Sequence, residues 1–256
     1  MKTNLVYPIL TLAAALTGNC LAAPPALDPK NPILEEFSSP DLNVSRFYQY
    51  NVGNAKLVNA LVQVGTKAKP KEEPKLNLTV LPDFTNDDFV SAELLTGYPG
   101  YFQNWEMTID LTNSSGAGKD VGCGFMIFNE ADRRDFLFVE FYGIAGVKAG
   151  VLVNGKDAAV GKLSAKYIFP KGSIRVRFNA VSKLMTFSAS IKDKSEGYKW
   201  YKIGTFSPTG QGGVVRANWK MKPTGQFGIQ LFGFGHKKMV DLEKVTLDNF
   251  AVKALR

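Results

Sequence analysis

The sequence has 256 residues and a formal net charge of +8, with 31 basic and 23 acidic residues, one histidine and two cysteines. The basic residues are scattered, and their densest run, residues 67–75, also holds acidic residues and two prolines. This composition is typical of a solvated loop and argues against a nucleic-acid partner. One histidine and so few cysteines also exclude a zinc site built from these residue types alone.

Residues 1–22 predict a secretory signal peptide. An apolar stretch runs from Leu5 to Leu16 after an initial lysine, and small residues follow near Ala22. The stretch is too short and wrongly flanked for a membrane anchor. We therefore expect a secreted or periplasmic protein without a transmembrane segment. Cleavage near Ala22 would remove Cys20 and leave Cys123 without a partner for an internal disulfide.

Residues 23–32 contain four prolines, which predicts an extended leader, and residues 33–256 predict a single domain. A mature chain of about 230 residues is long enough to bury one large core. We expect it to be a monomer.

Apolar and polar residues alternate along most of the domain, which predicts strands. The clearest runs are residues 105–111, 174–178 and 185–191, and turn signals such as Asn154-Gly155 separate them. No amphipathic helix stands out. Many short strands with Gly- and Pro-rich turns predict an all-β fold, an antiparallel two-sheet jelly-roll β-sandwich.

Several segments, taken in order, resemble the strands of the concanavalin A-like (laminin-G-like) jelly-roll family. They are residues 35–42 and 55–62 at the start, the Gly-rich strand 122–128, the polar turn 129–135, the aromatic strand 136–142, the strand 147–153 before Asn-Gly, and residues 225–231 and 245–252 at the end. The match spans roughly residues 33–253. The resemblance implies a sandwich that closes between its first and last strands, as in lectins and sugar hydrolases.

Two enzyme patterns of this family can be compared with the chain. Residues 130–135 loosely resemble the three-carboxylate signature of retaining β-glucanases, which needs two carboxylates about 5 Å apart on one strand face. Arginines interrupt the segment and Asn129 opens it like a turn, so we interpret it as a solvated hairpin. The Asn-Ser-Gly strand motif of 3-keto-disaccharide hydrolases has no clear counterpart before Phe125.

No catalytic residue is therefore assigned. His236 lies in a Gly-rich loop, where a surface histidine is expected rather than the base of a nucleophile. Cys123 lies between glycines on an apolar strand and is expected in the core. Glu140 is the carboxylate to examine first if the protein is an enzyme.

No cofactor is predicted, but a structural calcium ion would fit a loop rich in carboxylates and amides. The candidate ligands are Asp83, Asn86, Asp87 and Asp88, which also make an ordinary polar turn. Residues 139–141 resemble the strand that carries the metal-binding carboxylates of legume lectins. Tyr142 and Gly143 follow where that family has an aspartate, so the lectin metal site does not carry over.

The strand 136–142 offers a candidate carbohydrate-binding face. Its alternation directs Leu137, Val139 and Phe141 inward. The candidate ligand-binding residues are Phe136, Phe138, Glu140 and Tyr142 on the other face, with Arg175 and Arg177 on a second strand that either neighbours this face or points away from it. Sugar rings stack on exposed aromatic rings, and charged side chains bind their hydroxyls. The alternative is that both faces of strand 136–142 are buried and the arginines are solvated.

Trp200 and Trp219 flank the Gly-rich segment 210–213 and are further candidate contacts. We predict a secreted, non-catalytic carbohydrate-binding β-sandwich that recognises a polysaccharide or glycoconjugate. The basic charge makes an acidic polysaccharide a reasonable partner. The alternatives are a glycoside hydrolase or polysaccharide lyase of the glucanase or 3-keto-disaccharide hydrolase type, and a structural or adhesive surface protein.

Overall fold

The structure is a computed structural model that describes residues 27–35, 45–52, 60–63, 75–79, 88–95, 98–113, 121–142, 146–153, 156–162, 171–193, 197–210, 212, 215–235 and 244–256. The predicted signal peptide lies outside these residues. Among the described residues, no helix is long and apolar enough to span a membrane.

The regular elements of the described residues are all strands, as the alternating pattern predicts. They are β1 (Ile33–Glu35), β2 (Phe47–Val52), β3 (Ala60–Gln63), β4 (Lys75–Thr79), β5 (Asp88–Leu94), β6 (Trp105–Asn113), β7 (Val121–Asn129), β8 (Asp132–Tyr142), β9 (Gly146–Val153), β10 (Lys156–Lys162), β11 (Lys171–Asn179), β12 (Leu184–Asp193), β13 (Gly197–Ser207), β14 (Val215–Arg216), β15 (Phe227–Gly235) and β16 (Lys244–Ala254).

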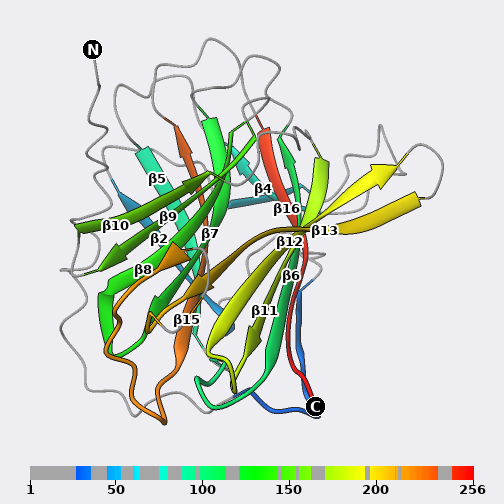
Figure 1. The fold of residues 1–256 in the computed structure, drawn as a ribbon. Helices are drawn as coiled ribbons and strands as arrows, with labels where there is room; N and C mark the ends of the chain where they lie inside the picture. Colours follow the sequence, from blue (N-terminus) through cyan, green and yellow to red (C-terminus); the bar gives the residue numbers. More distant parts are fainter. Residues whose placement is uncertain are drawn as a thin grey trace.

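The strands form two sheets (Figure 1). Within the described residues, the nine-stranded sheet has the order β14-β13-β12-β11-β6-β16-β4-β3, and β1 also pairs with β16. The seven-stranded sheet has the order β10-β9-β8-β7-β15-β5-β2. Neighbouring strands are antiparallel except β13 and β14. The predicted all-β, two-sheet sandwich is confirmed.

The first and last described strands lie side by side, with Ile33 opposite Val252. β15 lies inside the other sheet, between β7 and β5. The C-terminal region that carries the family resemblance therefore contributes a strand to each layer, β15 to one sheet and β16 to the other.

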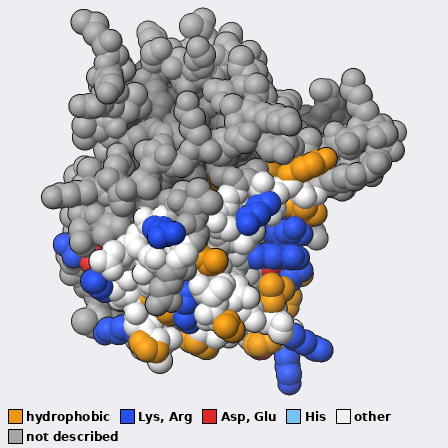
Figure 2. Space-filling model, viewed as in Figure 1, with side chains coloured by type: hydrophobic (Ala, Val, Ile, Leu, Met, Phe, Trp, Pro, Cys, Tyr) orange, Lys and Arg blue, Asp and Glu red, His pale blue; other side chains and the backbone are white. Residues whose placement is uncertain are grey.

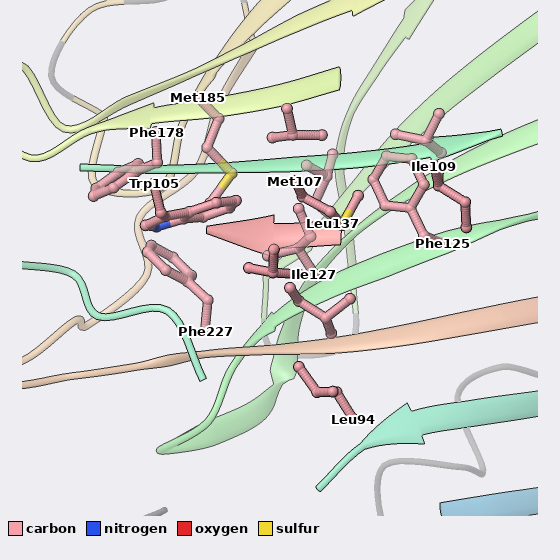
Figure 3. Close-up of a cluster of buried hydrophobic side chains, with 14 of the residues drawn as sticks. Leu94, Trp105, Met107, Ile109, Phe125, Ile127, Leu137, Phe178, Met185 and Phe227 are labelled. Atoms are coloured by element: carbon pink, nitrogen blue, oxygen red, sulfur yellow. The ribbon is translucent and has the colours of Figure 1, made fainter. Parts of the chain in front are cut away.

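The core lies between the sheets, where the inward side chains of both layers meet. Trp105 and Phe178 come from neighbouring strands of the nine-stranded sheet, and their ring centroids are 5.8 Å apart. Phe227 of the opposite sheet packs against Phe178 with centroids 5.0 Å apart (Figure 3). Each such pair is worth about 0.5–1.5 kcal/mol beyond the burial of its area. This cluster joins the two layers at one end of the core.

Residues 27–32, the described part of the predicted leader, contain a turn. The Asp28 carboxylate accepts hydrogen bonds from the Lys30 amide and the Asn31 side chain, which holds a turn. Leu27 is buried in the core cluster. Its amide donates to the Tyr98 carbonyl over 3.2 Å.

Candidate functional site

The face of β8 that the sequence proposes for ligand binding does point away from the core. Leu137 and Val139 belong to the core cluster, so Phe136 and Phe138 lie on the outer face of the seven-stranded sheet. Both rings are nevertheless only 2% exposed. Neither presents an open ring face on which a sugar could stack. Residues 136–139 match the alternative in which both faces of the strand are buried.

The two phenylalanines belong to an apolar layer on this outer face. Phe136 lies opposite Phe128, and Phe138 lies opposite Met126 on β7. Gly228 on β15 lies opposite Phe128 on its other side, and a Cβ atom there would lie 2.1 Å from the Phe128 ring. Glycine at this position leaves room for the aromatic ring across the strand.

For Glu140, Tyr142, His236 and the predicted calcium ligands, the structure does not describe the side chains. The backbone of Glu140 pairs with Lys148 and that of Tyr142 with Gly146. The side chains of Glu140 and Tyr142 lie outside the described residues, as does His236. Of the calcium candidates, Asp83, Asn86 and Asp87 also lie outside them, and Asp88 begins β5 but its side chain is not described. Within the described part of the chain, no group of three or more His, Cys, Asp or Glu side chains could hold a metal ion.

A polar cluster occupies the same outer face next to the β7–β8 hairpin. We call Glu93, Tyr98, Glu130 and Arg133 the outer-face cluster. Arg133 donates a hydrogen bond to Glu93 over 3.1 Å and makes an ion pair with the other Glu93 oxygen at 2.9 Å. It also donates to Glu130 over 3.0 Å. The Tyr98 hydroxyl donates to Glu93 over 3.4 Å.

Burial and charge shift the pKa values within the cluster. Burial raises the pKa of Glu130, although Arg133 acts against this shift. Burial also raises the pKa of Tyr98, and the charge of Glu93 adds to the effect. Burial opposes the charge of Arg133, but Glu93 and Glu130 outweigh it and raise the pKa of the guanidinium. Arg133 therefore stays charged and holds two carboxylates together.

The outer-face cluster reaches the solvent-exposed surface of the protein next to Tyr48. Glu93 lies opposite Tyr48 on β2 and opposite Gln230 on β15, so the three side chains share one face. Tyr48 is 46% exposed. The Arg133 guanidinium packs over the Phe128 ring, with its central carbon 4.8 Å from the ring centroid. An accessible aromatic ring thus lies next to charged hydrogen-bonding groups.

Sequence reasoning did not find this cluster, because Glu93 and Arg133 are separated by 40 residues. One signal was available, a single carboxylate between Ala92 and Leu94 on an otherwise apolar strand end. Such a residue is buried only when it has partners.

The 130–135 segment forms the predicted hairpin, with the turn at Glu130 and Ala131. It is less solvated than expected, since Asp135 is buried and accepts a hydrogen bond from Asn129 over 3.4 Å. Asp132 instead makes an ion pair with Arg134. The three carboxylates therefore do not line one strand face as the glucanase signature requires.

Arg175 and Arg177 lie on β11 in the other sheet, where Ile174 and Val176 point into the core. The two arginines therefore face outward on the opposite side of the sandwich from Phe136 and Phe138. Of the two alternatives for the arginines, the structure shows the one in which they point away from that strand.

No family model matches the sequence, and no characterised protein matches it in a sequence comparison. Several solved structures share its fold. Lectin II from Ulex europaeus is 12% identical, with a TM-score of 0.52, covering 90% of this chain and 100% of its own. Lectin UEA-II complexed with galactose is 12% identical, with a TM-score of 0.51, covering 88% of this chain and 99% of its own.

A third similar structure comes from work on endo-acting O-glycanases that initiate mucin breakdown in the human gut microbiota. It is 11% identical, with a TM-score of 0.53, and the match covers 88% of this chain and 99% of that one. At these identities the likeness shows the fold alone. The chain has the concanavalin A-like β-sandwich fold that lectins and glycan-cleaving enzymes share.

Proposed function

We propose that the protein is a non-catalytic carbohydrate-binding β-sandwich and that it binds a neutral sugar at the outer-face cluster beside Tyr48. The observation that carries the proposal is the Arg133 guanidinium, which holds two carboxylates next to an exposed aromatic ring. The predicted signal peptide supports a secreted or periplasmic location for this binding. The fold is also that of a lectin solved with galactose.

The chemistry of the cluster suits sugar hydroxyls. The exposed Tyr48 ring offers a stacking surface, while carboxylate oxygens accept and guanidinium groups donate hydrogen bonds. Arg133 and Glu130 are partly exposed and within reach of a ligand, whereas Glu93 is almost fully buried and positions Arg133. The cluster holds two carboxylates and one guanidinium, so its net negative charge favours a neutral sugar over an acidic one.

A glycoside hydrolase is the second candidate, favoured by the carboxylate spacing. Oxygens of Glu93 and Glu130 lie 2.9 and 3.0 Å from the same Arg133 nitrogen, so they are at most about 6 Å apart. Retaining glycosidases use a separation of about 5–5.5 Å. Burial raises the pKa of Glu130, as a general acid requires. The contact with Arg133 favours the ionised form of Glu130, whereas a general acid must carry a proton. We therefore propose binding first and hydrolysis second.

The test measures binding of neutral oligosaccharides by calorimetry across a panel that includes galactose-containing glycans. We expect Tyr48→Ala to weaken binding by about tenfold, since a stacking ring contributes about 0.5–1.5 kcal/mol beyond its buried area. Phe102→Ala is the matched control, because Phe102 is also exposed but does not belong to the cluster. Equal affinity of Tyr48→Ala and the unaltered protein would reject the site.

Release of new reducing ends from the bound glycans separates the two candidates. A binding protein releases none. If cleavage is seen and Glu130→Gln abolishes it while binding persists, the hydrolase replaces the binding protein as the function.

A further inference from the structure

The outer face of the nine-stranded sheet carries a second group of side chains suited to a ligand of different charge. Arg175 on β11 lies opposite Ser188 on β12, which in turn lies opposite Lys202 on β13. Trp200 lies on the same face, opposite Ser190. On the described surface, Lys and Arg side chains gather on the side of the molecule where Figure 1 shows β6, β11 and β12 (Figure 2).

Arg175 reaches across β12 to stack on Trp200. Its guanidinium carbon lies 4.3 Å from the Trp200 ring centroid, although β12 separates the two strands. The side chain must therefore lie over β12, which explains why the outward Ser188 and Ser190 are buried. Trp200 remains 39% exposed. The result is a platform of one indole and one guanidinium above short hydroxyl side chains.

The charge of Arg175 is incompletely compensated. Among the described residues, its buried Nε has no hydrogen-bond partner, and the Glu106 carboxylate oxygen that pairs with it lies 4.0 Å away. Glu106 already accepts hydrogen bonds from Arg177 and makes a 3.0 Å ion pair with Lys253. Burial lowers the pKa of Arg175, and the charge of Arg177 adds to this. A ligand anion beside Arg175 would supply the close negative charge that Glu106 does not, and it would offset the repulsion between Arg175 and Arg177.

The positive region has a defined extent. Over β11–β13, the described outward side chains include Arg175, Arg177 and Lys202 and no carboxylate. Asp110 and Asp248 lie opposite each other on β6 and β16, which limits the region on that side. An anionic ligand is therefore expected over β11–β13, next to Trp200.

We propose that this platform of Trp200, Arg175, Arg177 and Lys202 binds an anionic polysaccharide through its carboxylate or sulfate groups. The ring of an acidic sugar can pack against the indole while its anion meets the guanidinium groups. The three described cations of the platform are fewer than the about six to ten phosphate contacts of a strongly salt-dependent DNA-binding protein. They also fall short of a polybasic membrane-binding segment of four to eight residues.

This platform is separate from the proposed neutral-sugar site, because the two lie on opposite outer faces of the sandwich. Either site can exist without the other. A protein that binds both would join a neutral glycan to an acidic one.

The test passes the full-length protein over an immobilised polyuronate and an immobilised sulfated polysaccharide at increasing salt. We expect retention at low salt that is lost as salt rises, since exposed charge contacts are screened. Lys202→Gln and Arg175→Gln should each weaken binding several-fold, and Trp200→Ala about tenfold. Lys222→Gln is the charge-matched control, because Lys222 is exposed outside the platform, and it should change retention little.

Further arms separate the platform from the neutral-sugar site and from two other classes of anionic ligand. Tyr48→Ala should leave retention unchanged, which keeps the result independent of the neutral-sugar site. Carboxyl-reduced polyuronate should not be retained. The proposal is overturned if Lys202→Gln binds like the unaltered protein, or if duplex DNA or phosphatidylserine vesicles bind more tightly with the same sensitivity to the variants. Lys202 is exposed, so its variant remains informative even where Arg175→Gln fails to fold.

Discussion

Glu106 shows how one residue couples fold and surface. It is a nearly buried carboxylate on an outward strand position, and three cations from two neighbouring strands converge on it, Arg175, Arg177 and Lys253. A charge so little exposed is stable only when it is paired. Glu106 thereby also orients Arg177, which belongs to the anion platform.

The stability contribution of Glu106 should depend on pH. Burial alone would raise its pKa, but hydrogen bonds from Arg177 and Lys253 outweigh burial and lower it. A carboxyl whose folded pKa lies below its ordinary value adds stability that is fully present above about pH 4.3. That stability is lost as the pH falls through the lower folded value.

We therefore predict that Glu106→Gln lowers the free energy of unfolding by about 1–3 kcal/mol at pH 7. The deficit relative to the unaltered protein should shrink when urea unfolding is repeated between pH 4 and pH 3. Asp132→Asn is the control, because it removes an exposed ion pair with Arg134 and should cost less than about 0.5 kcal/mol. A deficit that grows at low pH would contradict the assignment.

At the scale of an element, β8 is a strand whose environment differs from a simple alternating pattern. Leu137 and Val139 pack between the sheets, and Phe136 and Phe138 are buried on the other side. A strand buried on both faces carries large apolar side chains at consecutive positions. The run Phe136-Leu137-Phe138-Val139 has this form, so its aromatic residues indicate packing rather than an open binding surface.

Truncation of the outer ring tests this interpretation of β8. Phe138→Ala should lower the free energy of unfolding by about 3–5 kcal/mol, because it leaves a cavity in a packed layer. Chemical denaturation measures the effect. Phe102→Ala, at an exposed ring, should change the same quantity little. An unchanged stability together with lost glycan binding would show instead that Phe138 contacts the ligand.

At the scale of the whole molecule, the sandwich places two chemically different surfaces on opposite sides of one core. The outer face of the seven-stranded sheet has buried aromatics and a carboxylate-rich cluster, and the outer face of the nine-stranded sheet has cations around Trp200. Opposite faces keep the two charge types apart. The core between them includes Leu27, which lies ahead of the first strand.

The contribution of Leu27 can be measured directly. Leu27→Ala should lower the free energy of unfolding by about 2–4 kcal/mol, because the side chain is buried and its amide is bonded to Tyr98. Pro29→Ala, at an exposed position two residues later, should cost less than about 0.5 kcal/mol. Equal stabilities of the two variants would place the start of the packed domain after residue 32.

Much of the fold could be predicted from the sequence because alternation is a local property. The runs around Trp105, Ile174 and Met185 each assign one face to the core, and the structure buries those side chains. The same rule correctly separates Phe136 and Phe138 from Leu137. It could not tell that the outer face is covered, because coverage depends on segments elsewhere in the chain.

The candidate sites depended on tertiary structure for the same reason. Glu93 meets Arg133 across 40 residues of sequence, and Arg175 meets Trp200 across an intervening strand. Local pattern determines which side chains share a face, since side-chain direction alternates along any strand. Sheet order and register decide which distant side chains become neighbours. By itself the sequence therefore determined the sandwich and its inward faces, and the packing of the sheets decided where an aromatic ring stays exposed beside a charged group.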